Sequence, residues 1–221
     1  MQNLTETVIH SPLKNRIFTD RQLKHLLQGS ACRRYGLVNR AMAAGEIVRI
    51  SRGIYVLDNR FRDFPCHPFA VAQALVPLSY ISFETALEQH GWIPESVQVI
   101  ASAIPGRKKS SLDHPLFGSF SFSPLALVRQ HYLDGVRRTQ IDSQTFLLAS
   151  PLRALFDLVC QRKIAWSGIK FLIDGLRIEK NNLDRLRYED CLKFVDVYQH
   201  NRTRQFIGEL TDELFPQRDT E

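Results

Sequence analysis

The sequence predicts an α+β protein with an N-terminal winged helix–turn–helix, followed by a mixed α+β domain that ends in helices. A capped helix, a second helix and a hairpin pattern follow one another within residues 19–57. Strand-like runs separated by glycine and proline fill residues 97–149, and helical periodicity prevails from residue 150. We therefore expect a DNA-binding domain over residues 1–65 and an α+β domain over residues 66–221.

The clearest helix start lies at Thr19. Thr19 and Gln22 have the spacing of a capping box, in which the threonine hydroxyl accepts from the Gln22 amide and the Gln22 side chain accepts from the Thr19 amide. Phe18 and Leu23 occupy the positions of a hydrophobic staple. We predict a helix from this point to Gly29, because glycine favours helix termination.

A second helix and a hairpin are predicted directly afterwards. The apolar positions with helical spacing are Leu37, Val38, Ala41 and Met42. They indicate a helix over about residues 34–44 that buries this face. Residues 46–50 and 53–57 are apolar, β-branched runs, and Gly53 suits the turn between them. This order of elements is that of a winged helix–turn–helix.

The net positive charge lies almost entirely in the first third of the chain. Residues 1–68 contain 11 Lys and Arg against 5 Asp and Glu, which equals the net charge of +6 of all 221 residues. Residues 69–221 are therefore neutral. Such asymmetry indicates that one segment faces a polyanion.

The second predicted helix and the hairpin carry the candidate contacts to double-stranded DNA. The candidates beside or on the helix are Arg33, Arg34, Asn39 and Arg40. Arginine pairs bidentately with guanine and asparagine with adenine, so we expect these residues to enter the major groove. The candidates on the hairpin are Arg49, Ser51 and Arg52. We expect them to contact phosphates, which fix register without reading sequence.

Three blocks of sequence resemble one known family. The blocks are residues 35–57 (YGLVNRAMAAGEIVRISRGIYVL), residues 79–92 (SYISFETALEQHGW) and residues 150–158 (SPLRALFDL). Their order and content resemble the AbiEi-like abortive-infection antitoxins of type IV toxin–antitoxin systems. From the first block to the last, residues 35–158 cover somewhat more than half of the chain.

The resemblance implies a bacterial, cytoplasmic transcriptional regulator with a role in phage defence. Such antitoxins bind repeats in the promoter of their own operon and repress it. They also oppose a nucleotidyltransferase-like toxin without forming a stable complex with it, and the C-terminal domain is linked to that activity. The DNA-contact role is carried over only to the seven candidates named above.

The second domain is predicted to begin after a linker over residues 58–67. Pro68 suits the first turn of a helix that ends near Leu75, and Ser82 is expected to cap a helix that ends at Gly91. Strands are expected over residues 97–103, 119–123 and 145–149. Three apolar helical stripes follow Ser150: Leu155, Leu158 and Val159; Leu192, Val195 and Val197; Phe206, Ile207 and Leu210.

Enzymatic and metal-binding alternatives rest on few residues. Glu84, Glu88 and His90 share one predicted helix, but carboxylates four residues apart are typical of a solvated helix face. The adjacent Cys66 and His67 lack a second pair of metal ligands, so we expect no metal and no cofactor. A nuclease targeted by the winged helix and a winged-helix adaptor for a protein partner remain the alternative hypotheses, and we expect no enzyme.

The remaining sequence features concern the compartment. The segment from Met1 to His10 has neither the basic start nor the apolar core of a signal peptide, and no apolar run approaches the length of a membrane span. The four cysteines are widely spaced. We therefore expect reduced thiols and no contact with a membrane.

Arg107, Lys108 and Lys109 form a basic run in a predicted loop. Two interpretations stay open for this run: a solvated turn and an extra contact to phosphate.

Overall fold

The computed structural model describes residues 3–216 and has a mixed α+β architecture, as predicted. The chain divides into two compact units. Met1–Pro77, His114–Phe117 and Thr139–Phe146 form the first unit, and Leu78–Asp113, Gly118–Arg138 and Leu147–Glu221 form the second. The predicted boundary at residue 65 stays a prediction.

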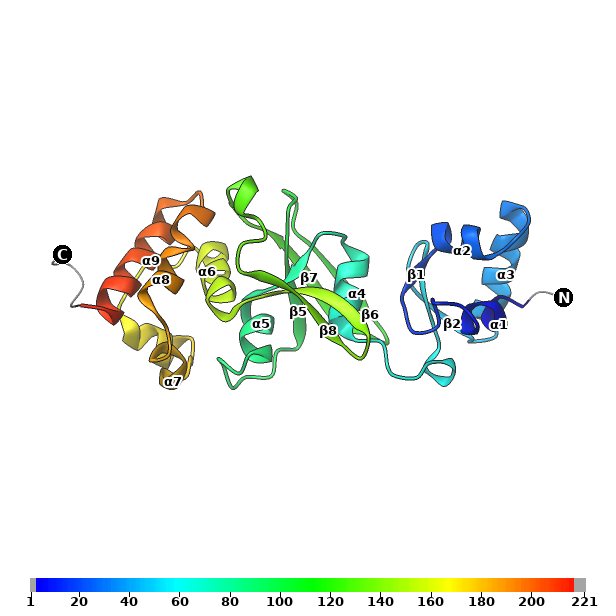
Figure 1. Ribbon diagram of the computed structural model, residues 1–221, viewed down its shortest axis with the longest axis horizontal. Helices are drawn as coiled ribbons and strands as arrows, with labels where there is room; N and C mark the ends of the chain where they lie inside the picture. Colours follow the sequence, from blue (N-terminus) through cyan, green and yellow to red (C-terminus); the bar gives the residue numbers. More distant parts are fainter. Residues whose placement is uncertain (1–2, 217–221) are drawn as a thin grey trace. The chain divides into compact units, whose positions relative to one another are not determined.

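The first unit begins with three helices and a small sheet (Figure 1). The helices are α1 (Leu4–Ile9), α2 (Asp20–Leu26) and α3 (Ala31–Ala43), and the strands are β1 (Phe18–Thr19), β2 (Ile47–Ser51) and β3 (Ile54–Leu57). The sheet has the order β1-β3-β2 and both pairings are antiparallel. The predicted hairpin is therefore confirmed, while α1 and β1 were not predicted.

One hydrophobic core joins these helices to the sheet. The buried side chains come from every element: Leu4 and Val8 of α1, Phe18 of β1, Leu23 of α2, Leu37, Val38 and Ala41 of α3, Ile47 of β2, and Tyr55 and Leu57 of β3, with Leu27 after α2. The predicted apolar face of α3 is thus buried, with Met42 only partly covered. Burial on this scale holds the two helices and the hairpin in one fixed arrangement.

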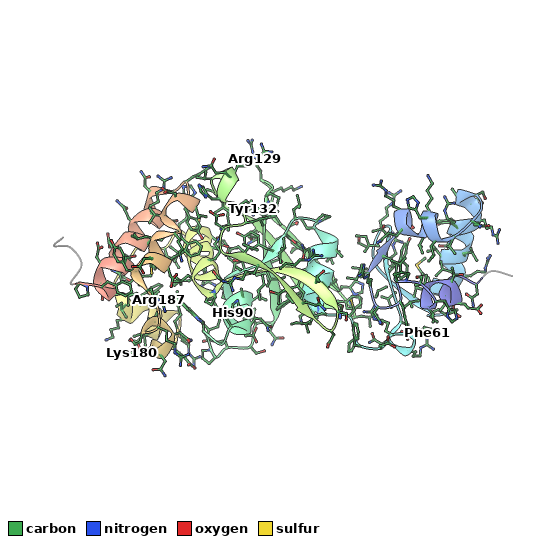
Figure 2. The ribbon with its side chains drawn as sticks, viewed as in Figure 1. Phe61, His90, Arg129, Tyr132, Lys180 and Arg187 are labelled. Carbon is green, nitrogen blue, oxygen red and sulfur yellow. The ribbon has the colours of Figure 1, made fainter. Side chains whose placement is uncertain are left out.

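The segment after β3 is packed against the first unit rather than extended. A short 3-10 helix, η1 (Asn59–Phe61), is followed by Arg62, whose side chain is buried and donates to the backbone oxygens of Phe64 and Asn15. Phe61 is labelled in Figure 2. The Arg60 guanidinium lies over its ring and forms a salt bridge with Asp58. Polar contacts therefore fold this predicted linker back onto the chain.

Helix α4 (Pro68–Leu75) begins and ends where the sequence predicts. His67 caps it, because His67 Nδ1 accepts from the Phe69 amide at 3.2 Å. The His67 ring stacks on Phe146 and packs edge-on against Phe69. Burial lowers the pKa of His67, while Asp142 acts in the opposite direction. The imidazole is therefore held in the neutral form that the cap requires.

A six-stranded mixed sheet follows, with the strand order β6-β7-β5-β4-β9-β8. The strands are β4 (Tyr80–Ile81), β5 (Val99–Ile104), β6 (Ser110–His114), β7 (Gly118–Pro124), β8 (Val136–Ile141) and β9 (Gln144–Ala149). β4 pairs antiparallel with β5 and parallel with β9, and β5 pairs parallel with β7. The predicted strands correspond to β5, β7 and β9, and Phe120 and Phe122 of β7 are buried.

Helices complete the second unit. They are α5 (Phe83–Gln89), α6 (Pro151–Arg162), α7 (Lys180–Leu183), α8 (Tyr188–Leu192) and α9 (Asn201–Leu214), with a π-helical turn at Phe171–Gly175 and short 3-10 turns at Arg129–His131 and Val195–Val197. Helix α6 packs against α5 and α9, and α8 packs against α9 (Figure 1). The apolar stripes of α6 and α9 are buried as predicted, whereas Leu192 is exposed and its predicted stripe is wrong.

A buried polar network lies at the centre of the second unit. Arg153 and Asp157 of α6 form a fully buried salt bridge. Asp157 accepts hydrogen bonds from Tyr80, Ser82 and Tyr198 at 2.9, 2.7 and 2.8 Å. The Ser82 hydroxyl therefore does not cap α5, and the predicted capping hydrogen bond is wrong, because this hydroxyl satisfies a buried carboxylate instead.

Two further findings concern the compartment. No helix within residues 3–216 is long and apolar enough to cross a membrane. The four cysteines form no disulfide: Cys32 is exposed, and Cys66, Cys160 and Cys191 are buried. Burial raises the pKa of Cys66 and of Cys191 to about 11, so both are held as thiols.

Candidate nucleic-acid interface

The start of α2 carries the predicted capping box. The Gln22 amide donates to Thr19 Oγ1 at 3.3 Å, and the Thr19 amide donates to Gln22 Oε1 at 2.8 Å. The helix ends at Leu26, three residues before the predicted Gly29. Gly29 lies instead in the turn to α3, with a φ of 105° that favours glycine.

Helix α3 begins earlier than predicted, at Ala31. Ser30 Oγ accepts from the Arg33 amide at 3.2 Å and caps the helix. This cap places Arg33 and Arg34 in the first turn, where backbone amides and the helix dipole also favour anions. Arg34 Nη1 donates to the Gly29 oxygen at 2.6 Å. The two arginines therefore gather positive charge at the start of α3.

The face of α3 away from the core carries the other predicted contacts. Arg33 and Arg40 are both exposed and lie two helical turns apart, with Gly36 between them. A Cβ at Gly36 would have Arg40 Nη1 as its nearest neighbour, at 3.6 Å. Asn39 is half-buried on the adjacent face. The small residue at position 36 leaves room for a surface to approach the helix closely.

Tyr35 is the exposed residue on this helix that the sequence-based reasoning missed. Its exposed fraction is 69%, the largest among the exposed bulky apolar side chains of residues 3–216. It points away from the face that carries Arg33 and Arg40, but it lines a cavity together with Arg34. An aromatic side chain among arginines was available as a signal, but its exposure depends on the rotation of the helix about its axis.

The hairpin tip is tied to the start of α2. The turn residues are Arg52 and Gly53, and Gly53 has a φ of 76°. The Asp20 amide donates to the Gly53 oxygen at 3.0 Å, and a Cβ at Gly53 would lie 2.9 Å from Asp20 Oδ2. Glycine is therefore required both by the backbone angle and by this close approach. The contact fixes the position of Arg52 relative to α2.

Arg49 and Ser51 lie on β2, on either side of a register shift in the hairpin. Arg49 is exposed, and its Nε donates to the Ser51 oxygen at 3.4 Å. Neighbouring Tyr55 is buried, which raises its pKa, and the Asp20 carboxylate raises it further. The hairpin thus presents two exposed arginines, Arg49 and Arg52, above a neutral buried tyrosine.

The cations of this segment fall into two groups. Lys14, Arg60 and Arg62 are engaged in holding the chain together. The other eight make no salt bridge with any residue between 3 and 216: Arg16, Arg21, Lys24, Arg33, Arg34, Arg40, Arg49 and Arg52. Within the described part of the chain, no carboxylate therefore neutralises their charge.

A cavity of about 460 Å³ connects α2, α3 and the hairpin. Arg21, Lys24 and Arg34 supply cations to its lining, together with Tyr35 and Tyr55. Arg21 and Lys24 are not among the seven candidates named from the sequence. The cavity brings Arg34 of the candidate set together with these residues. With the Asp20 carboxylate also in the lining, the three cations leave a net positive charge that suits a phosphate.

The candidate enzymatic residues do not converge. Glu84 forms a salt bridge with Arg162, and Glu88 accepts from the Val97 amide. His90 Nε2 lies 2.8 Å from the Ala149 oxygen (Figure 2). Each side chain has a different partner. No group of three His, Cys, Asp or Glu suited to a metal ion occurs in the part of the chain that the structure describes.

Comparisons with known proteins add no assignment. Neither the family models nor the curated proteins with which the sequence was compared give a match.

Proposed function

We propose that this protein is a DNA-binding transcriptional regulator in which α2, α3 and the β2–β3 hairpin act as a winged helix–turn–helix. The observation that carries the proposal is the set of eight cations that make no salt bridge within residues 3–216, seven of which lie on these helices and the hairpin. A cation exposed in this way gains free energy by displacing the counterions of a phosphate backbone. Its position on a rigid helix and hairpin adds a defined geometry.

The division of roles follows from the elements. Helix α3 enters the major groove, where Arg33, Arg34, Asn39 and Arg40 read base edges. The hairpin contacts the adjacent backbone through Arg49, Ser51 and Arg52. Arg21 and Lys24 of α2 contact phosphates on the other side of α3, since the first helix of such motifs crosses the backbone.

We further propose that the regulator is an antitoxin of the AbiEi-like type IV kind, acting in the cytoplasm without a cofactor or metal. The three resembling blocks support this proposal. Two of these blocks meet in the structure, since residues 79–92 supply Tyr80 and Ser82 and residues 150–158 supply Arg153 and Asp157 to one buried network. In this role the protein represses its own operon and opposes a nucleotidyltransferase-like toxin without a stable complex.

The experiment that tests DNA binding uses the full-length protein and a duplex from the region upstream of its own gene. Electrophoretic mobility shift with a scrambled duplex of equal length measures specificity. Preferential binding of the upstream duplex is expected. Equal affinity for both duplexes would leave only nonspecific binding, and no shift would favour the adaptor hypothesis. Parallel incubation with Mg²⁺ or Mn²⁺ tests the nuclease alternative, because cleavage of the duplex would replace the regulator by an enzyme.

The antitoxin role has a separate test. An adjacent reading frame that resembles a nucleotidyltransferase is expected, and its expression alone should arrest growth. Co-expression of this protein should restore growth. A variant of this protein that no longer binds DNA should restore growth as well. Failure to restore growth would remove the antitoxin role and leave the regulator role standing.

A further inference from the structure

A second cavity, of about 520 Å³, lies within the second unit. Its walls come from Trp92, from the start of β8, from the first turn of α6 and from the region of α8. A volume of this size falls in the range of about 300–1,000 Å³ that is typical of sites for small organic molecules. The cavity is separate from every element of the proposed DNA interface.

One part of this cavity is apolar and aromatic. Trp92 and Phe194 are exposed by only 7% and 6%, and Leu152 and Leu186 complete the apolar lining. The Trp92 indole Nε1 makes no hydrogen bond with any residue from 3 to 216. The Trp92 and Phe194 rings give the cavity a flat apolar wall.

The cavity is held in shape by the backbone at Gly135. Gly135 has a φ of 71°, and its oxygen accepts from the Ser150 amide at 2.7 Å. A Cβ at this position would lie 2.5 Å from Phe194 Cε1. The turn before β8 therefore packs directly on the aromatic wall, which keeps the cavity preformed rather than created by a ligand.

The charged side chains that line the cavity differ in whether they form a salt bridge. Asp134 pairs with His131 at 2.6 Å, and Lys193 pairs with Asp190 at 2.7 Å. Arg137 on β8 forms no salt bridge or side-chain hydrogen bond among residues 3–216. The cavity therefore has one uncompensated cation beside an aromatic wall. One unpaired cation can balance a single negative charge, so a ligand with several negative charges would stay partly uncompensated here.

We propose that this cavity binds a small organic monoanion with a flat apolar body. Arg137 receives the anionic group through charge-assisted hydrogen bonds, and Trp92 and Phe194 contact the body. With one unpaired cation in its lining, the cavity favours monoanions over dianions and polyphosphates. The proposal is independent of DNA binding, because no residue of the DNA interface takes part.

The test uses the ¹⁵N-labelled full-length protein and trans-cinnamate, an aryl monocarboxylate. The chain has two tryptophans, and a Trp166→Phe variant assigns their indole signals. Cinnamate is expected to shift the Trp92 signal saturably, with a dissociation constant of roughly 0.01–1 mM for a ligand of this size. The Trp166 indole, which donates to Glu213 at 3.2 Å, should not move. Absence of a saturable Trp92 shift would overturn the proposal.

Two ligands and two variants test the chemical class. Cinnamyl alcohol has the same shape without charge, so its affinity for the wild type should be at least about tenfold lower than that of cinnamate. The affinity of cinnamate for Arg137→Gln should fall by a similar factor. Arg129→Gln, an exposed arginine outside the lining, is the matched control and should leave the affinity unchanged. Equal affinities for cinnamate and cinnamyl alcohol would overturn the role of Arg137. An unchanged affinity of Arg137→Gln for cinnamate would do the same. Tighter binding of phenyl phosphate would overturn the selection for monoanions.

Discussion

Arg153 Nε donates to Asp157 Oδ1 at 2.8 Å, and both side chains are fully buried one turn apart on α6. Burial alone would lower the pKa of Arg153, but Asp157 and the surrounding tyrosine hydroxyls raise it above its usual value. Tyr80 and Tyr198 have pKa values well above the usual one, because they are buried and lie beside this carboxylate. Three structural elements, β4, α6 and the segment before α9, therefore meet at one charged pair.

Removal of the Asp157 charge should destabilise the second unit severely. Asp157→Asn leaves the Arg153 guanidinium buried without a counter-charge, which costs about 3–5 kcal/mol of the free energy of unfolding. Urea denaturation followed by circular dichroism measures the loss. The matched control lies on the same helix: Arg162→Gln breaks the exposed pair with Glu84 and should cost under about 1 kcal/mol. Equal losses in the two variants would contradict the central role of the buried pair.

The Ser30 cap separates helix stability from DNA binding. Ser30→Ala removes the acceptor for the Arg33 amide and should lower the stability of the first unit by about 1 kcal/mol. Ser30→Asp keeps an acceptor and suits the helix dipole, so its stability should equal or exceed that of the wild type. Its DNA affinity should nevertheless fall, because the new carboxylate neutralises charge beside Arg33 and Arg34. Wild-type affinity of Ser30→Asp would argue against this surface.

His67 should make the first unit sensitive to acid. The pKa of His67 is lowered in the folded protein, mainly by burial, so the unfolded chain takes up a proton first as the pH falls. The free energy of unfolding is therefore retained above the ordinary histidine pKa of about 6.5 and lost progressively below it. His67→Asn keeps a capping acceptor without titrating. Denaturation at a series of pH values should show that the free energy of unfolding falls less on acidification in this variant than in the wild type. An identical fall in both proteins would contradict the role of His67.

Tyr35 should contribute to binding without contributing to folding. Its exposed fraction of 69% predicts that Tyr35→Ala leaves the free energy of unfolding within about 0.5 kcal/mol of the wild type. DNA affinity should fall by about tenfold, since a stacked or packed aromatic contact is worth about 1–3 kcal/mol. Fluorescence anisotropy with labelled upstream duplex measures the affinity. An unchanged dissociation constant would remove Tyr35 from the interface.

Local signals in the sequence predicted the starts of α2, α4 and α6. The capping box at Thr19 and the proline starts of α4 and α6 involve residues within one helical turn, so no tertiary contact is needed to recognise them. The strands β6 and β8 were missed because they form the two edges of the sheet and carry mostly polar, exposed residues. Their pairing depends on the neighbouring strands rather than on an apolar pattern.

Other errors in the prediction from sequence concern serine side chains that could cap a helix or bond elsewhere. Ser82 has the sequence of a cap, but a carboxylate 75 positions away takes its hydroxyl. Ser30, which was overlooked, caps α3 and thereby moves Arg33 and Arg34 onto the helix. The candidate arginines were recognised from charge alone. Their freedom from acidic partners, and the engagement of Arg60 and Arg62 elsewhere, emerge only from the folded arrangement.

The most direct test of the regulator proposal is the salt dependence of binding to the upstream duplex, measured by fluorescence anisotropy. Each phosphate neutralised adds about 0.9 to the slope of log K against log salt, so five to seven contacts predict a slope of about −4 to −6. Arg52→Ala should reduce this slope by about 1, while Arg185→Ala, an exposed arginine of the second unit, should leave it unchanged. A flat salt dependence, or equal slopes for the wild type and Arg52→Ala, would contradict the proposed interface.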